Sequence, residues 1–302
     1  MEIKFDNVTL VTNLGTPLEK TILNNVNFKL SGNKIYGILG NSNSGKTSLA
    51  ELISALIKPT KGKVIVNEFV NDGGRIKNVN KLRLLTGYIY KNPYDMFICK
   101  NVKKELEFGM KYFKYKLEKL KIRPNDALKM VGLSEDYMNK NPLELDLKDA
   151  KKLALACTII YNPKVIIFDE PTIGLNYKDK KELIRLLKTL KDKYNKMIIL
   201  LSKDTDFLYS ISDYTYIFDK SNLKQYQIDP KNKQVIIVGD EQNEGFAYIN
   251  GEERTISVYD LNSENVTFSE KNDQYANISY DSIYPFNYYA IYRVGDNFYK
   301  VY

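Results

Sequence analysis

Eight residues, GNSNSGKT, separate a continuous apolar run from a segment whose apolar residues have helical spacing. The run covers residues 34–39, the eight residues are 40–47, and the helical spacing continues to residue 58. This order of strand, glycine-rich turn and helix is the pattern of a phosphate-binding loop. Glycines let the backbone curl so that successive N–H groups face a polyphosphate, and the start of the helix adds its positive dipole. A chance match in a turn rich in serine and asparagine is the alternative, and the flanking strand and helix argue against it.

The loop therefore predicts a binding site for a nucleoside triphosphate. We expect the Lys46 ammonium to bridge the terminal phosphates, which also makes Lys46 a candidate catalytic residue. We expect the Thr47 hydroxyl to hold a magnesium ion. The candidate nucleotide-binding residues are those of the loop and the start of the helix: Gly40, Asn41, Ser42, Asn43, Ser44, Gly45, Lys46, Thr47 and Ser48.

A second motif, VIIFDE at residues 165–170, is an apolar strand that ends in two carboxylates. In a phosphate-loop ATPase the first carboxylate holds magnesium, directly or through water, and this role falls to Asp169. The second can orient or deprotonate the attacking water, which makes Glu170 the candidate catalytic base. A capped strand end before a helix would explain one acid more easily than two. The two motifs together predict a site for ATP and Mg²⁺.

The rest of the first 225 residues has the rhythm of an α/β protein. Continuous apolar runs at 164–168 and 197–201 flank a predicted helix at 178–190, as buried parallel strands require. Strand-like alternation covers residues 1–30, and shorter strands are predicted at 63–66 and 88–90. Between residues 102 and about 152 the period becomes helical, broken by prolines at 124 and 142. We therefore expect a phosphate-loop α/β core interrupted by a helical subdomain at about 95–152.

Beyond residue 225 the composition changes. Runs at 234–238, 255–259 and 288–294 are β-branched and aromatic, and 11 of the 24 tyrosines follow residue 220. This pattern predicts a small, mainly antiparallel β domain at 226–302, joined to a first domain at 1–225. From residue 220 onward there are 8 Lys and Arg against 12 Asp and Glu, whereas the first 219 residues have 37 against 25.

Charge and hydropathy limit the possible partners and compartment. A basic first domain suits nucleotide phosphates, anionic lipid headgroups or nucleic acid, although a solvated lysine-rich surface explains the charge equally well. No apolar run approaches the ~18 residues that span a bilayer, and the first ten residues lack the pattern of a secretion signal. These features predict a soluble cytosolic protein. The two cysteines, Cys99 and Cys157, lie in apolar segments and are predicted to be core residues without a disulfide.

The second motif also resembles a known family. Asp169-Glu170-Pro171-Thr172 followed by Gly174-Leu175 is similar to the corresponding segment of ATP-binding cassette (ABC) subunits, and the resemblance covers residues 1 to about 225. Segments 15–26, 87–97 and 101–109 resemble the ATPases of energy-coupling-factor (ECF) transporters, which import vitamins and metal ions.

The resemblance implies a RecA-like core with a helical subdomain, and hydrolysis of ATP coupled to transport. It further implies a heterodimer with a second ABC ATPase subunit, an integral membrane scaffold subunit and a substrate-binding membrane subunit. The location would be cytoplasmic, peripheral on the inner face of the cell membrane, and no nucleic-acid partner is expected.

Several family positions hold other residues here. The signature, usually LSGGQ, aligns with residues 145–149, LDLKD, so that Leu147 and Lys148 replace two glycines and two acids face a polyanion. The glutamine that usually touches magnesium aligns with Lys91, and the switch histidine aligns with Lys203. The remaining departures are Asn176 for an aspartate, Thr12 for an adenine-stacking aromatic and Asn43 for a loop glycine.

Two interpretations of these departures remain. In one, the lineage has drifted and function is largely retained. In the other, the chain is a degenerate cassette that binds ATP, pairs with a more conventional partner and hydrolyses slowly; the survival of Lys46, Thr47, Asp169 and Glu170 favours this interpretation. A nucleotide-binding module without transport turnover is a further alternative. A nucleic-acid-associated or ribosome-associated ABC protein is less favoured, because the ribosome-associated kind carries two cassettes and only one phosphate loop is visible here.

Overall fold

In the computed structural model the chain consists of two compact units, Met1–Gln225 and Tyr226–Tyr302. The structure describes residues 1–40, 44–112 and 124–218 of the first unit. In the second unit it describes the backbone of residues 227–228, 245–250, 255–260, 265–271, 284–286, 289–294 and 297–301.

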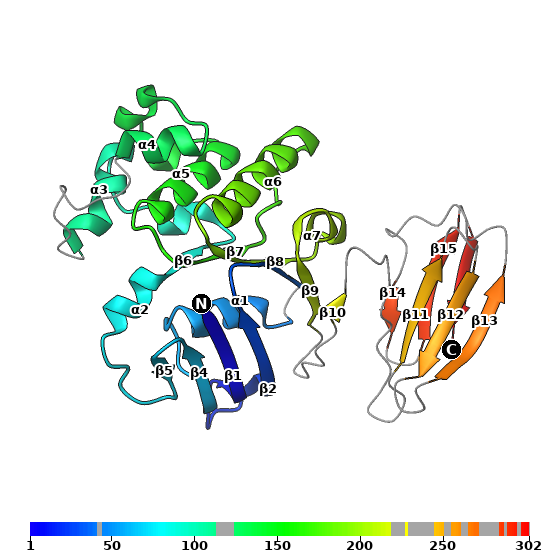
Figure 1. The fold of residues 1–302 in the computed structure, drawn as a ribbon. Helices are drawn as coiled ribbons and strands as arrows, with labels where there is room; N and C mark the ends of the chain where they lie inside the picture. Colours follow the sequence, from blue (N-terminus) through cyan, green and yellow to red (C-terminus); the bar gives the residue numbers. More distant parts are fainter. Residues whose placement is uncertain are drawn as a thin grey trace. The chain divides into compact units, whose positions relative to one another are not determined.

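A parallel sheet lies at the centre of the first unit, with strand order β9-β3-β8-β7-β6 (Figure 1). Its strands are β3 (Ile35–Leu39), β6 (Thr86–Ile89), β7 (Val165–Asp169), β8 (Met197–Ser202) and β9 (Tyr214–Ile217). Because β8 pairs with both β3 and β7, the strand before the phosphate loop and the strand with the two carboxylates end at the same edge of the sheet.

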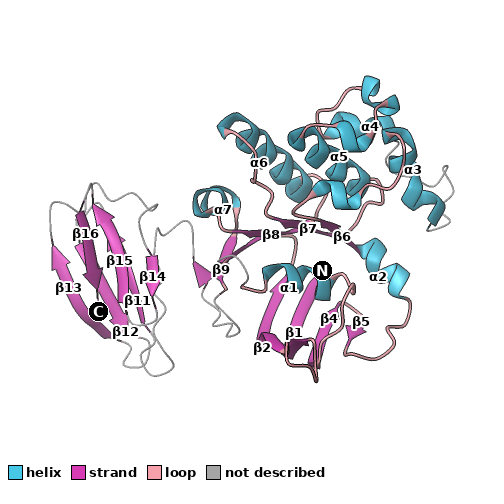
Figure 2. Ribbon diagram, turned by 180° about the vertical axis from the view of Figure 1, so that it is seen from behind, coloured by secondary structure: helices cyan, strands magenta, loops and turns pink. Residues whose placement is uncertain are grey.

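An antiparallel sheet covers one face, with α1 (Lys46–Ile53) between the two sheets in both ribbon views (Figure 2). Its order is β2-β1-β4-β5. The strands are β1 (Glu2–Thr12), β2 (Lys20–Ser31), β4 (Lys61–Val66) and β5 (Phe69–Asn71). The long pairing of β1 with β2, from Glu2↔Ser31 to Thr12↔Lys20, matches the alternation predicted for residues 1–30.

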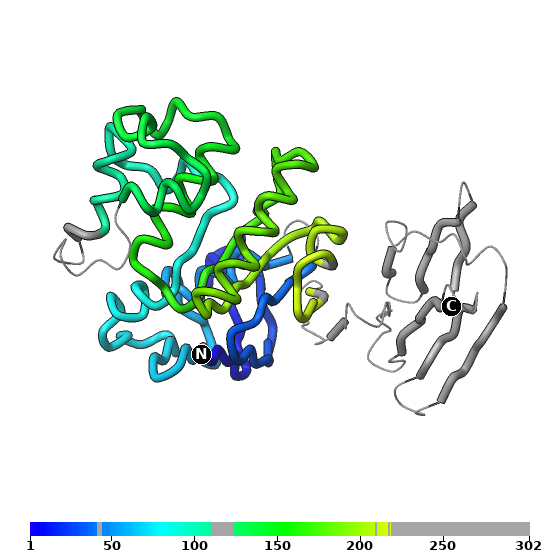
Figure 3. The backbone as a smooth tube through the Cα atoms, turned by 45° about the horizontal axis from the view of Figure 1, so that its top comes forward, coloured from blue at the N-terminus to red at the C-terminus, as the bar shows by residue number. Residues whose placement is uncertain are grey.

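Helices cover the other face of the parallel sheet: α5 (Leu147–Ile159), α6 (Tyr177–Asp192) and α7 (Thr205–Ile211) pack against its strands. Helices α3 (Val102–Tyr112) and α4 (Pro124–Met130) pack on α5, and 3-10 turns lie at Pro93–Met96, Glu135–Asn139 and Pro142–Glu144. A further helix, α2 (Val79–Leu85), precedes β6. In Figure 3 the chain runs from the blue N-terminal strands through the green helices and back to the yellow-green segment 197–218 beside the blue strands.

The central strands are buried on both faces, which explains their continuous apolar sequence. Along β7, Ile166 and Phe168 pack among the helices, whereas Val165 and Ile167 pack toward α1 and the antiparallel sheet. All four side chains are at most 4% exposed. Such burial makes a continuous apolar run, rather than an alternating one, the sequence pattern of a strand between two layers. The predicted α/β class, parallel core and intervening helices are therefore confirmed.

Three boundaries differ from the prediction. The helix after the phosphate loop ends at Ile53, not at residue 58, because Ala55 adopts a left-handed backbone (φ 52°) and the Leu56 N–H donates to the Glu51 carbonyl at 2.8 Å. The strand predicted at 88–90 is β6, Thr86–Ile89, without Tyr90. Helix α5 continues seven residues beyond residue 152, the predicted end of the helical segment.

The second unit consists of short strands. Strands β11 (Gly245–Asn250), β12 (Thr255–Asp260) and β13 (Asn265–Lys271) form one antiparallel sheet, and β14 (Tyr284–Phe286), β15 (Tyr289–Val294) and β16 (Asn297–Val301) form another. A two-residue strand, β10, covers Gln227–Ile228. The runs at 255–259 and 288–294 correspond to β12 and β15, whereas the run predicted at 234–238 lies outside the described residues.

Two further predictions concern membrane-spanning helices and the two cysteines. Within the described residues, no helix is both long and apolar enough to cross a membrane. Cys157 packs against the hydrophobic core but is not part of its fully buried set, and Cys99 is likewise only partly buried. The prediction of a core residue is therefore confirmed for Cys157 and wrong for Cys99, which follows a 3-10 turn where its N–H donates to Glu105 Oε2 at 2.7 Å.

Candidate functional site

The candidate site forms where the parallel strands β3, β8 and β7 end. The phosphate loop follows β3, Ser202 and Lys203 lie at the end of β8, and Asp169 and Glu170 lie at the end of β7. Loops at the carboxyl ends of adjacent parallel strands converge on one edge, which is where such sheets bind ligands. The structure therefore brings together side chains that are far apart in the sequence, from Lys46 at one end to Lys203 at the other.

Lys46 is the first residue of α1 and lies almost fully inside the protein, with its side chain 6% exposed. Its ammonium donates to the Gly40 carbonyl across the loop and lies 3.7 Å from Glu170 Oε1, whose side chain is 8% exposed. Burial lowers the Lys46 pKa, and the negative charges of Glu170 and Asp169 oppose that shift. A buried ammonium beside a carboxylate is thus held ready for a more highly charged anion.

Thr47 and Asp169 meet directly. The Thr47 hydroxyl donates to Asp169 Oδ2 at 2.7 Å, across 122 residues of sequence. A hydroxyl and a carboxylate are the oxygen ligands that Mg²⁺ prefers, and phosphate-loop proteins use this residue pair for it. The two candidate metal ligands, predicted separately from two motifs, are therefore adjacent.

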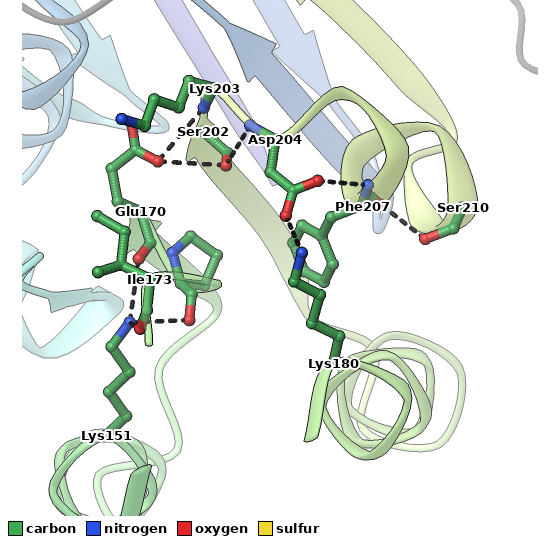
Figure 4. A network of polar contacts seen from close by, with 10 residues as sticks. Lys151, Glu170, Ile173, Lys180, Ser202, Lys203, Asp204, Phe207 and Ser210 are labelled. Carbon is green, nitrogen blue, oxygen red and sulfur yellow. Dashed lines mark hydrogen bonds and ion pairs between the residues drawn. The ribbon is translucent and has the colours of Figure 1, made fainter. Parts of the chain in front are cut away.

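The Glu170 carboxylate is held by three groups. Besides the ion pair with Lys46, its Oε2 accepts hydrogen bonds from the Ser202 hydroxyl and the Lys203 N–H, both at 3.3 Å (Figure 4). Its own N–H donates to the Leu201 carbonyl at 2.8 Å. Glu170 also has a left-handed backbone (φ 48°), which L-residues rarely adopt, so these contacts fix an unusual conformation at the strand end.

The phosphate loop has two features that suit an anion. Gly45 has φ +95°, and a Cβ there would lie 3.0 Å from Leu23 Cδ2, so glycine is favoured by both backbone and space. Within the described residues, the Ser44 hydroxyl is buried and lacks a hydrogen-bond partner, as expected for a group that awaits a ligand. Ser48 lies in the first turn of α1, whereas Asn41, Ser42 and Asn43 lie outside the described residues.

Tyr88 and Glu51 lie near the candidate metal ligands and were not predicted from the sequence. The Tyr88 hydroxyl donates to Asp169 Oδ2 at 3.3 Å, and the Tyr88 ring packs on Tyr90 with centroids 4.7 Å apart. Burial, together with the charge of Asp169, raises the pKa of Tyr88 and that of the Glu51 carboxyl on α1. The signal that could have found Tyr88 is the pairing of β6 with β7, which places Tyr88 opposite Ile167, two residues before Asp169.

We expect Tyr88→Phe to raise the Mg²⁺ concentration that half-saturates ATP hydrolysis by about three- to tenfold. Partners that orient a metal-ligating carboxylate typically contribute about tenfold or more to metal affinity. A single hydrogen bond of 3.3 Å places the effect at the low end. The measurement is a Mg²⁺ titration at saturating ATP, with Tyr90→Phe as the control that removes the neighbouring phenol. Equal half-saturating Mg²⁺ concentrations in the two variants would contradict this role.

Four residues of the segment aligned with the family signature make contacts within this chain. Asp146 caps α5 by accepting a hydrogen bond from the Asp149 N–H at 2.8 Å, and Asp149 accepts one from the Tyr137 hydroxyl at 2.5 Å. Lys148 pairs with Asp179 on α6 at 2.5 Å. Leu147 packs closely on Gly174: a Cβ on Gly174 would lie 2.4 Å from Leu147 Cδ2. The two acids are thus engaged in helix capping and a phenol contact, a detail that the alignment alone did not supply.

Four other residues that depart from the family pattern lie at or just beyond the ends of strands or helices. Lys91 is exposed after β6, and Lys203 is exposed at the end of β8 with its N–H on Glu170. Asn176 caps α6 by accepting a hydrogen bond from the Asp179 N–H at 3.0 Å, so the change from aspartate keeps a capping residue. Thr12 ends β1, and its hydroxyl donates to the Lys20 carbonyl.

Comparison with known proteins places this geometry in a family. A family model described as ABC transporter matches residues 23–173. The energy-coupling factor transporter ATP-binding protein EcfA2 of Staphylococcus aureus is 32% identical over 232 residues, which cover 76% of this chain and 81% of that protein. The chain belongs to the ABC transporter ATPase family. The resemblance to ABC and ECF-type ATPases found in the sequence is therefore confirmed, and with it an ATP-binding and ATP-hydrolysing cassette.

Solved structures agree with this assignment. The cassette aligns with cbiO1 of Clostridium perfringens, described as part of the ABC transporter complex cbiONQ, with a TM-score of 0.66 and 25% identity over 76% of this chain and 89% of that one. It also aligns with MJ0796, a bacterial ABC transporter cassette solved as a dimer, with a TM-score of 0.67 over 76% of this chain and 98% of that one. At 23% identity the second likeness shows the fold alone.

Proposed function

We propose that this cassette is the ATPase subunit of an ECF-like importer that takes up a vitamin or metal ion. It works in a heterodimer with a second cassette, on an integral membrane scaffold subunit and beside a substrate-binding membrane subunit. Residues 1–225 form the cassette, and residues 226–302 form a separate β-rich domain. The observation that supports the site is the meeting of the two motifs, with Thr47 2.7 Å from Asp169 and Lys46 3.7 Å from Glu170.

In this proposal the phosphate loop, residues 40–48, holds the triphosphate. Loop N–H groups and the Ser44 hydroxyl would donate to phosphate oxygens, while Thr47 and Asp169 would hold Mg²⁺. The ion, when bound, neutralises charge on the phosphates. Lys46 moves its ammonium from Glu170 to the terminal phosphates, because the triphosphate has the greater negative charge.

Release from Lys46 leaves Glu170 Oε1 able to accept a proton from the attacking water. Its Oε2 stays on the Ser202 hydroxyl and the Lys203 N–H, which fix the plane of the carboxylate. A base fixed in orientation is the requirement for general-base catalysis, and it typically contributes 10²- to 10⁴-fold to a rate. The Lys46–Glu170 ion pair thus balances two buried charges until nucleotide arrives.

We further propose that the cassette is degenerate at its signature. In a sandwich of two cassettes each signature segment faces the partner's ATP, and its paired glycines permit close backbone approach. Here Leu147 packs at Gly174 in the loop before α6, and Lys148 pairs with Asp179 in the first turn of α6. A conventional partner would supply the effective signature for the ATP bound by Lys46, whereas this chain would supply a weak one in return.

Names of relatives support the membrane setting. EcfA2 is an energy-coupling factor transporter subunit and cbiO1 is part of a transporter complex, so by analogy the cassette lies at the cytoplasmic face of the cell membrane. Purification of the tagged chain from its native membranes tests this. A second cassette and a polytopic membrane protein should co-purify with it. Recovery of the chain without either protein would contradict the importer assignment.

A separate measurement tests degeneracy. The purified chain alone should bind ATP with Mg²⁺ by calorimetry yet turn over slowly. Brisk hydrolysis by the chain alone, lost in Glu170→Gln, would reject degeneracy while supporting the site. ATP binding with no hydrolysis even in the purified complex would instead support a nucleotide-binding module without transport turnover.

A further inference from the structure

Lys151 on α5 is the central residue of a contact that the site described above does not include. Its ammonium donates to three backbone carbonyls of one loop: Glu170 at 3.2 Å, Pro171 at 3.0 Å and Ile173 at 2.6 Å (Figure 4). These three bonds use all the donors of a protonated lysine. The loop starts at the candidate catalytic base, so Lys151 fixes the backbone that carries the Glu170 carboxylate.

The same loop touches the start of α5 at a second point. Leu147 lies against Gly174, and Leu147 and Lys151 are four residues apart, on one face of the helix. One helical turn thus holds the loop from Glu170 to Gly174 at both ends. The first turn of α5 contains the last three residues of the signature segment, 147–149, so a shift of this turn would move the loop with it.

A comparable contact holds the other loop beside Glu170. Lys180 on α6 pairs with Asp204 at 2.6 Å, and Asp204 N–H donates to the Ser202 hydroxyl, which in turn donates to Glu170 Oε2. Figure 4 shows the two lysines approaching the site from separate helices. Lys180 acts on a side-chain carboxylate through two intermediates, whereas Lys151 binds the Glu170 backbone itself.

We propose that Lys151 is a positioning residue for ATP hydrolysis, which links the signature turn of α5 to the position of Glu170 in the same chain. This inference rests on the proposed role of Glu170 as the base. When α5 faces a partner's bound nucleotide, a displacement of its first turn reaches Glu170 through Lys151. Hydrolysis at one ATP is thereby coupled to occupancy of the other.

The protonation state of Lys151 offers a way to observe this link. Burial lowers the pKa of Lys151 to about 8, with Glu170 opposing the shift. A neutral amine has two N–H donors, so at least one of the three carbonyls loses its bond above that pH. The rate should fall as the pH rises through 8.

The charged and titratable groups around Lys151 come from five elements. They are Lys148 and Lys152 on α5, Asp179, Glu182 and Arg185 on α6, Lys129 on α4, Asp169 and Glu170 at β7, and Tyr90 after β6.

Three variants of the full chain test the proposal in single-turnover hydrolysis with excess protein, over a range of ATP and of pH. Lys151→Met removes the donors and should lower the rate constant about tenfold, with ATP affinity unchanged within about threefold. Lys151→Arg keeps charge and donors, so it should restore the rate. The matched control, Lys152→Met, makes the same charge change at the next residue, whose ammonium lies 3.9 Å from Glu182 Oε2. It should behave as the wild type.

The pH profiles separate positioning from a structural role. If the neutral form is tenfold slower, the wild-type rate should fall about fivefold between pH 7 and 9, and the decline should vanish in Lys151→Arg, whose guanidinium stays protonated. Should Lys151→Met fail to fold, the comparison of wild type with Lys151→Arg still decides. Equal alkaline declines in wild type and Lys151→Arg, or a wild-type rate in folded Lys151→Met, would overturn the proposal.

Glu170→Gln, measured in parallel, distinguishes this inference from the proposed function. An unchanged rate in Glu170→Gln would remove the base assignment and the Lys151 role together. A large loss in Glu170→Gln combined with no loss in Lys151→Met would remove the Lys151 role alone.

Discussion

Glu170→Gln should lower single-turnover ATP hydrolysis by about 100-fold or more, because general-base catalysis typically contributes 10²- to 10⁴-fold. The amide has nearly the size of the carboxylate and still accepts hydrogen bonds from Ser202 and Lys203 N–H. It cannot take a proton from water. The change therefore removes the proposed base and leaves the shape of the site. ATP affinity, measured by calorimetry with MgCl₂, should be retained, because the phosphate loop is unchanged.

The control for this prediction is Glu68→Gln, which neutralises an exposed acid in the turn between β4 and β5. Its rate should match that of the wild type. A loss below about threefold in Glu170→Gln would show that water attack does not depend on this carboxylate, since general bases contribute far more. Loss of ATP binding in Glu170→Gln would indicate instead that Glu170 acts by holding the phosphate loop through Lys46.

The core of the fold was predictable because its strands are local signals. Strands β7 and β8 are continuous apolar runs, and both faces of each are buried, so sequence and burial agree residue by residue. The end of α1 was not predictable. Leu56 and Ile57 continue the helical period, and only the left-handed Ala55 ends the helix. Alanine is a strong helix former, so its sequence gives no sign of a left-handed backbone.

The residues of the candidate site were likewise predictable only in part. Lys46 and Thr47 belong to one short motif and Asp169 and Glu170 to another, and parallel pairing through β8 brings the motifs together. Tyr88 was not predicted, because its partner Asp169 is 81 residues away and its ring suggests a core residue.

Lys151 was not predicted for a related reason. Its partners are backbone carbonyls, which every residue has, so no side-chain motif marks them. The signature segment shows a third limit. Alignment gave the places of Asp146 and Asp149, but their partners became known only from the geometry of α5.

Lys46→Met should weaken ATP binding by about 100-fold, because a charge-assisted contact to phosphate is lost and each tenfold corresponds to about 1.4 kcal/mol. It should also lower the free energy of unfolding by roughly 3 kcal/mol, since removal of one partner leaves a buried charge on Glu170. The remaining contacts of Glu170 with Ser202 and Lys203 N–H place this cost at the low end of the range. Urea unfolding and calorimetry measure the two effects.

The double variant Lys46→Met with Glu170→Gln separates stability from binding. Neutralising both partners should recover most of the unfolding free energy, because no buried charge remains, whereas ATP affinity should stay low. Lys29 and Glu2 provide the comparison pair: they are closer, at 2.9 Å, but about half exposed, so Lys29→Met should cost less than about 1 kcal/mol. If Lys46→Met were no more destabilising than Lys29→Met, burial would not be the source of the Lys46–Glu170 coupling. If the double variant regained ATP affinity, Lys46 would act on Glu170 rather than on phosphate.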